Sequence, residues 1–174
     1  MPIFDLKNAY VSLVDGTSGT ANSLLIKIGE GTLTWSEKVN RKFFLDRGII
    51  DEVRNEDQVP MEVHIEAVWQ YLKADTGQPV TIEDVLKQRG TASTWVSTNP
   101  DACQPYCVDV HVYYEVACAT IKDESIVLPQ FYYESINHDA KAGHLSLSGK
   151  CNATQSTSTR IAQSSRPVFG ADGG

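Results

Sequence analysis

The sequence has no run of about 18 apolar residues, which a membrane-crossing helix would need, and no apolar run behind basic residues near its start. We therefore expect no secretory signal, no membrane insertion and synthesis in a cytoplasm. Cysteine is scarce, with only Cys103, Cys107, Cys118 and Cys151 among 174 residues. In a cytoplasm these are expected to be reduced thiols, and the apolar surroundings of Cys118 favour a core position.

Basic residues are in deficit, since 15 lysines and arginines stand against 22 aspartates and glutamates, for a net charge of −7. A protein that grips nucleic acid needs basic side chains to neutralise phosphates, so this balance argues against that class. It does not exclude a surface past which nucleic acid slides without binding, because mild repulsion helps there.

Catalytic motifs are missing as well, because neither a Gly-x-Ser-x-Gly elbow nor a dinucleotide-binding glycine pattern occurs. Gly143 to Lys150 ends like a phosphate-binding loop, but five residues separate its glycines where four are needed. The pair Cys103 and Cys107, with the other cysteines and four histidines, could supply metal ligands, although its spacing is unusual for zinc. We expect neither an enzyme nor a cofactor.

What the sequence does contain is strand-forming residues: seven Tyr, five Phe, three Trp and many β-branched side chains. Apolar and polar residues alternate as in half-buried strands over segments 9–14, 22–28, 32–38, 39–45, 60–72, 108–121, 125–137 and 144–154. One short helix is predicted, with Thr81 as N-cap, Asp84 completing the cap and Gly90 as the stop. The predicted fold is mainly β: a two-sheet antiparallel β-sandwich with one short flanking α-helix.

One domain is expected over residues 9–154, with an N-terminal arm at 1–8 and a C-terminal arm at 155–174. The C-terminal arm is rich in Ser, Thr and Gly, so we expect it to be mobile in isolation. Pro129 interrupts a strand pattern, which predicts a bulge or an edge position at that point.

Residues 46–57 form a long charged loop between two strand patterns. A solvated loop is one interpretation. The other is a surface for another subunit, because apolar residues are interleaved there with both signs of charge, as at an interface with a polar rim. The candidate contact residues are Arg47, Ile49, Ile50, Asp51, Val53 and Arg54.

Two strand faces carry acidic and polar side chains. One holds Glu62, His64 and Glu66, and the other holds Asp109, His111 and Glu115. The first set could mimic acid–base machinery, but a solvated sheet face explains the same residues without an added assumption.

Several segments between residues 29 and 151 follow one another in a characteristic order. They are Leu33-Thr34-Trp35-Ser36-Glu37-Lys38, Leu45-Asp46-Arg47-Gly48, Asp51-Glu52-Val53-Arg54, Pro60-Met61-Glu62-Val63, Trp69, the helix start Thr81-Ile82-Glu83-Asp84, Cys103-Gln104-Pro105-Tyr106 and Val127-Leu128-Pro129. In this order the chain resembles the major tail tube protein of long-tailed (siphovirus-type) bacteriophages.

The resemblance implies a structural protein of the phage tail, made and assembled in the bacterial cytoplasm. Six copies would form a ring, and stacked rings would form a hollow tube through which genomic DNA passes without specific binding during ejection. Residues 46–57 would bridge neighbouring subunits, and one of the two polar faces would line the lumen. The implied partners are the chain itself and other tail proteins (tape measure, terminator and distal tail protein).

Three other interpretations are open. A tail terminator or a baseplate ring protein would share the fold but stop at one ring. A cytosolic β-sandwich enzyme or metal-binding module belongs to a different class. A carbohydrate-binding sandwich is a further alternative, suggested by Trp35, Trp69 and Trp95.

Overall fold

The structure is a computed structural model, which describes residues 9–19, 21–26, 31–69, 72–73, 79–116 and 120–165. Within these residues the fold is mainly β, all strand pairs are antiparallel, and there is a single α-helix, so the predicted class, mainly β and antiparallel with one short helix, is confirmed. The predicted N-terminal arm at 1–8 and the predicted core residue Cys118 lie outside the described residues.

Most strands belong to one continuous sheet, ordered β2-β1-β9-β10-β11-β6-β3, with β12 pairing β10. The hairpin β4–β5 and the short pair β7–β8 are separate. The strands are β1 Ala9–Val14, β2 Ser23–Ile26, β3 Leu33–Ser36, β4 Val39–Asp46, β5 Ile49–Gln58, β6 Met61–Val68, β7 Leu72–Lys73, β8 Pro79–Val80, β9 Val108–Tyr114, β10 Asp123–Asp139, β11 His144–Cys151 and β12 Thr157–Ile161. The helices are α1 Ile82–Lys87 and the 3₁₀ turns Gly90–Ala92 and Gln163–Ser165.

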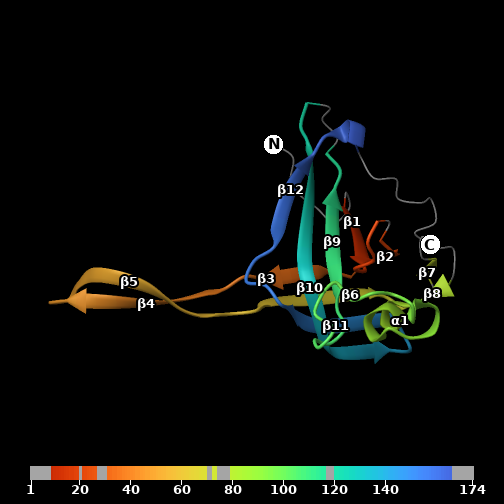
Figure 1. Cartoon of the computed structure of the whole chain (residues 1–174), viewed down its shortest axis with the longest axis horizontal. Helices are drawn as coiled ribbons and strands as arrows, with labels where there is room; N and C mark the ends of the chain where they lie inside the picture. Colours follow the sequence, from red (N-terminus) through yellow and green to blue (C-terminus); the bar gives the residue numbers. More distant parts are fainter. Residues whose placement is uncertain are drawn as a thin grey trace.

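Strand β10 joins the two layers of the fold. Its first residues pair with β9 and β12, and its later residues pair with β11, so the same strand belongs to both halves of the sheet. The register with β9 shifts between Leu128 and Phe131, and Gln130 has a positive φ of 50°. The bulge predicted from Pro129 is therefore confirmed. In Figure 1, β9 and the first part of β10 run across the direction of β3, β6 and β11.

The two halves enclose one hydrophobic core. Strand β6 contributes Met61, Val63, Ile65 and Ala67, whose side chains are buried while the residues between them are not. This alternation is the one predicted from the sequence, although the strand ends at Val68 instead of reaching residue 72. From the other half, Leu13, Leu24, Val110, Val112 and Leu128 enter the same cluster.

Gly149 lets β10 and β11 approach closely. A Cβ atom added there would lie 2.1 Å from the Tyr132 carbonyl oxygen, a distance that no side chain tolerates. Because Gly149 has no side chain, β10 and β11 can pack this closely.

Helix α1 begins as predicted. The Thr81 side chain accepts from the Asp84 amide at 3.2 Å, and the Asp84 carboxylate accepts from the Thr81 amide. The predicted stop at Gly90 is wrong, because the helix ends at Gln88 in the left-handed conformation (φ 51°). The Gln88 side chain donates to the Trp95 carbonyl at 2.6 Å, and this bond holds the residue there.

The C-terminal arm is partly structured, so the prediction of mobility is wrong for residues 157–161. They form β12, which pairs with β10 from Asp123↔Ile161 to Val127↔Thr157. The strand is almost fully exposed and polar, and it therefore lacks the apolar alternation by which sequence reasoning finds strands.

Candidate interaction surfaces

The predicted loop at residues 46–57 is instead most of one strand of a hairpin formed by β4 and β5. The turn is Arg47-Gly48, and both residues have positive φ (52° and 80°), as two-residue hairpin turns of type I′ require. The loop interpretation failed because the charged residues of β5 alternate only weakly with apolar ones. Figure 1 shows the hairpin extending away from the sheet.

The hairpin continues the ladder of β3 and β6. Ser36 pairs with Glu62 in the sheet, and Val39 pairs with Gln58 at the base of the hairpin. The same two strands thus run from the packed sheet into solvent, where no residue of the hairpin is buried.

Large apolar side chains gather on the hairpin. Ten such side chains are exposed among the described residues, and six of them belong to the hairpin: Val39, Phe43, Leu45, Ile49, Ile50 and Val53. The exposed fraction reaches 73% at Ile49 and 62% at Leu45 and Ile50. Several large apolar side chains exposed on one element are typical of an interaction site.

The strand register divides the hairpin into two unlike faces, because directly paired residues share a face and faces alternate along a strand. Phe43 pairs with Val53, and Leu45 pairs with Ile50, so these four side chains form one apolar face.

The opposite face is charged. It contains the pairs Lys42↔Arg54 and Phe44↔Glu52. The Lys42 ammonium and the Arg54 guanidinium each lie 5.2 Å from the centroid of the Phe44 ring, and Arg54 binds Glu52 at 2.9 Å. Phe44 is consequently the one half-buried residue of β4, and the side chains around it on this face contact one another.

A bulge at Asp51 completes the apolar face. Phe44 pairs with Glu52 and Leu45 with Ile50, so Asp51 has no direct partner. If the pairing ran on without this bulge, Asp51 would face Leu45 and Ile50 would turn to the charged side. Ile49, paired with Asp46, lies on the charged side at the tip.

The predicted contact residues are therefore distributed over both faces. Ile50 and Val53 lie on the apolar face, Ile49 and Arg54 on the charged face, Arg47 in the turn and Asp51 in the bulge. Sequence reasoning left out Phe43 and Leu45 because they precede the charged stretch. The apolar trio Phe43-Phe44-Leu45, too apolar for an exposed strand, was the signal that could have identified them.

The first predicted polar face is present on the outside of β6. Glu62, His64 and Glu66 point away from the core, and His64 Nε2 lies 3.4 Å from Glu66 Oε1. Their neighbours in the paired strands are also polar: Thr34 and Ser36 in β3, and Ser146, Ser148 and Lys150 in β11.

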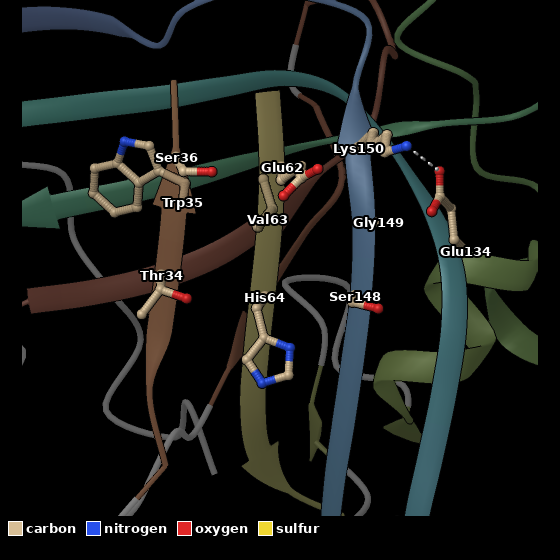
Figure 2. Close-up of a pocket in the computed structure, with 10 residues that line it drawn as sticks. All are labelled: Thr34, Trp35, Ser36, Glu62, Val63, His64, Glu134, Ser148, Gly149 and Lys150. Atoms are coloured by element: carbon tan, nitrogen blue, oxygen red, sulfur yellow. Dashed lines mark ion pairs between the residues drawn. The ribbon is translucent and has the colours of Figure 1, made fainter. Parts of the chain in front are cut away.

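A shallow hollow of 420 Å³ lies on this face beside the base of the hairpin. Figure 2 shows Glu62 and His64 from β6, with Lys150 reaching toward Glu134 across the neighbouring strands. The Lys150 and Glu134 side chains form an exposed ion pair at 3.7 Å. The hollow is open and lined by residues of both charges, so it resembles a solvated sheet face more than a closed pocket.

The second predicted polar set lies in the other half of the sheet. The Asp109 carboxylate accepts from the Gln130 amide at 2.8 Å and so stabilises the bulge in β10. Burial lowers the pKa of His111, with Asp109 acting in the opposite direction. Glu115 follows the end of β9. The two sets are therefore not on one surface, and Asp109 is engaged within its own chain.

The described part of the chain offers no cluster of side chains for the metal-binding or the carbohydrate-binding alternative. Among the described residues no group of three or more His, Cys, Asp or Glu side chains could hold a metal ion. Cys103 is exposed, Cys107 and Cys151 are buried, and burial raises the pKa of Cys151 to about 12. Trp95 is buried, Trp35 packs against the core and Trp69 is exposed, so the three tryptophans form no shared platform.

Comparison with known proteins adds no assignment: the chain matches no protein-family model, and it matches no curated protein at a significant level. Within the described part of the chain, no helix has the length and apolar character needed to cross a membrane.

Proposed function

We propose that the chain is a self-assembling subunit of a phage tail tube, in which hexameric rings stack into a hollow tube for DNA. The observation that carries the proposal is the two-faced hairpin, whose apolar face has no partner among the described residues of its own chain. The order of segments that resembles the tail tube protein of long-tailed phages supports the particular assembly.

The hairpin is costly for a single chain to maintain in water. A two-stranded hairpin in water is marginally stable, and an exposed apolar face adds a tendency to associate. Transfer of Phe43, Leu45, Ile50 and Val53 into a contact contributes about 1–2 kcal/mol per side chain. A second copy that covers this face would stabilise both the hairpin and the assembly.

The face around Glu62, His64 and Glu66 is the better candidate for a DNA-facing lumen. It is outward-facing and half-buried or exposed, whereas Asp109 accepts a hydrogen bond from the Gln130 amide within its own half of the sheet, and burial lowers the pKa of His111. Carboxylates on such a wall repel the phosphate backbone, so DNA can pass without binding. The working location is the virion tail, after assembly in the host bacterial cytoplasm with the other tail proteins.

Electron microscopy of the purified chain, together with sedimentation, tests the proposal. Long regular tubes are expected. Replacement of residues 39–58 by Asn-Gly, which joins β3 to β6 by a tight turn, should leave the sheet folded and abolish the tubes. Tubes formed by this variant would show that the hairpin has been misassigned.

The alternatives give different outcomes in the same experiment. Single rings that do not stack favour a terminator or baseplate protein. A stable monomer with stoichiometric zinc, measured by elemental analysis, favours a metal-binding module and contradicts self-assembly.

A further inference from the structure

The bend that connects β11 to β12, residues 152–156, passes the base of the hairpin. In Figure 1 this connection runs close to the point where β4 and β5 leave the sheet. The bend itself is anchored to the bulge of β10, because the Asn152 amide donates to the Gln130 carbonyl at 3.0 Å. The Asn152 side chain also donates to Gln130 Oε1 at 2.9 Å.

From this anchored bend, hydrogen bonds reach both strands at the base of the hairpin. On the returning strand, the Met61 amide donates to the Ala153 carbonyl at 2.9 Å. On the outgoing strand, Glu37 lies between β3 and β4, and its Oε1 accepts from the Ser156 amide at 2.6 Å and from the Ser156 hydroxyl at 2.7 Å. Hydrogen bonds to a carboxylate are stronger than those between neutral groups.

The base matters because the hairpin is long and no other described part of the chain buries it. Strands of 8 and 10 residues extend about 30 Å at roughly 3.3 Å per residue. A rotation of about 10° at the base would therefore displace the tip by about 5 Å. Such a displacement is enough to take Leu45 and Ile50 out of contact with a partner surface.

We propose that the Glu37–Ser156 contact is a clasp that sets the direction of the hairpin, and that Glu37 is a positioning residue for assembly. The clasp also couples two distant segments, because Ser156 immediately precedes β12, whose first residue, Thr157, pairs with Val127. The pairing of β12 with β10 and the direction of the hairpin are therefore coupled. The role in assembly rests on the self-association proposed above, but the clasp is a property of the single chain.

The test compares Glu37→Ala, which removes the acceptor, with Glu37→Gln, whose amide oxygen can still accept. Glu56→Ala in β5 is the matched control, since it removes the same charge from an exposed position of the hairpin. In unassembled chain, we expect the Ser156 amide to exchange at least about fivefold faster in Glu37→Ala than in the wild type. Glu37→Gln and Glu56→Ala should remain close to wild type.

Hairpin direction is measured separately, by the distance distribution between genetically encoded spin labels at Asp46 and Lys141. The distribution should broaden in Glu37→Ala, and tube formation should fall, while Glu37→Gln restores both. An unchanged distribution in Glu37→Ala overturns the clasp whether or not tubes form. Broadening in a chain whose wild type never assembles supports the clasp and contradicts only the proposed function.

Discussion

The hairpin β4–β5 continues the direction of β3 and β6, two neighbouring strands of the sheet, yet hairpin and sheet differ in what holds them together. In β6, every second side chain is buried in the core, whereas in β4 and β5 no side chain is buried. The described part of the sheet therefore buries its inner face within one chain. The hairpin has the amphipathic character of a sheet layer, but among the described residues no second layer covers its apolar face, which is why we propose another copy as its partner.

The largest expected difference between the two regions is in stability. Phe131 is 1% exposed in the core, while Phe43 is 56% exposed on the hairpin. We expect Phe131→Ala to lower the free energy of unfolding by about 3–5 kcal/mol, and Phe43→Ala to change it by less than about 0.5 kcal/mol. Urea denaturation of unassembled chain measures both. A similar loss in the two variants would mean that the hairpin packs on its own sheet.

The next comparison separates the two faces of the hairpin, using the adjacent residues Ile50 and Ile49. Ile50→Asp places a charge on the apolar face and should raise the concentration needed for tube formation by about 30–100-fold, which corresponds to about 2–3 kcal/mol. Ile49→Asp introduces the same charge on the other side and should have a smaller effect. Sedimentation at a series of concentrations gives both values, and a reversed order would contradict the register-based assignment.

A smaller effect concerns pH and the half-buried His111. Its pKa is lowered in the folded chain, so between that pKa and about 6.5 the unfolded chain binds a proton that the folded chain does not. Stability should therefore decrease as the pH falls below about 6.5, and His111→Gln should weaken this dependence. Urea denaturation at pH 7.5 and 5.5 measures it, with His64→Gln on the outer face as the control. An unchanged pH dependence in His111→Gln would remove His111 as the cause.

The smallest effect is expected from deletion of Asp51. Because this residue is the bulge, its removal leaves Leu45 opposite Ile50 and Phe44 opposite Glu52 in a regular ladder. Both faces are preserved, so tube formation should change by no more than a few-fold in the sedimentation assay. Loss of tubes would mean that the bulge itself is part of the contact.

Sequence patterns predicted the elements whose two faces differ in polarity. The alternation of β6, the cap formed by Thr81 and Asp84, and the bulge at Pro129 all follow from local rules, and the structure confirms them. The sequence could not show that β10 belongs to both halves of the sheet. Strand pairing depends on contacts between residues that are far apart in the sequence.

The same rules missed the exposed elements. Strand β12 and most of β5 have no buried face, so the period of two that marks a strand is weak or absent. The two faces of the hairpin could not be predicted either. Which side chains share a face depends on the position of the bulge at Asp51, and only the strand register shows that position.

Photo-crosslinking from the hairpin tests the central claim most directly. The full chain would carry benzoylphenylalanine in place of Phe43 on the apolar face or, as the control, in place of Lys42 on the charged face. The account predicts that irradiation at assembly concentrations links Phe43-substituted chains to a second copy, identified by mass spectrometry, and links Lys42-substituted chains much less. Monomers alone, or crosslinks confined to the same chain, would contradict it.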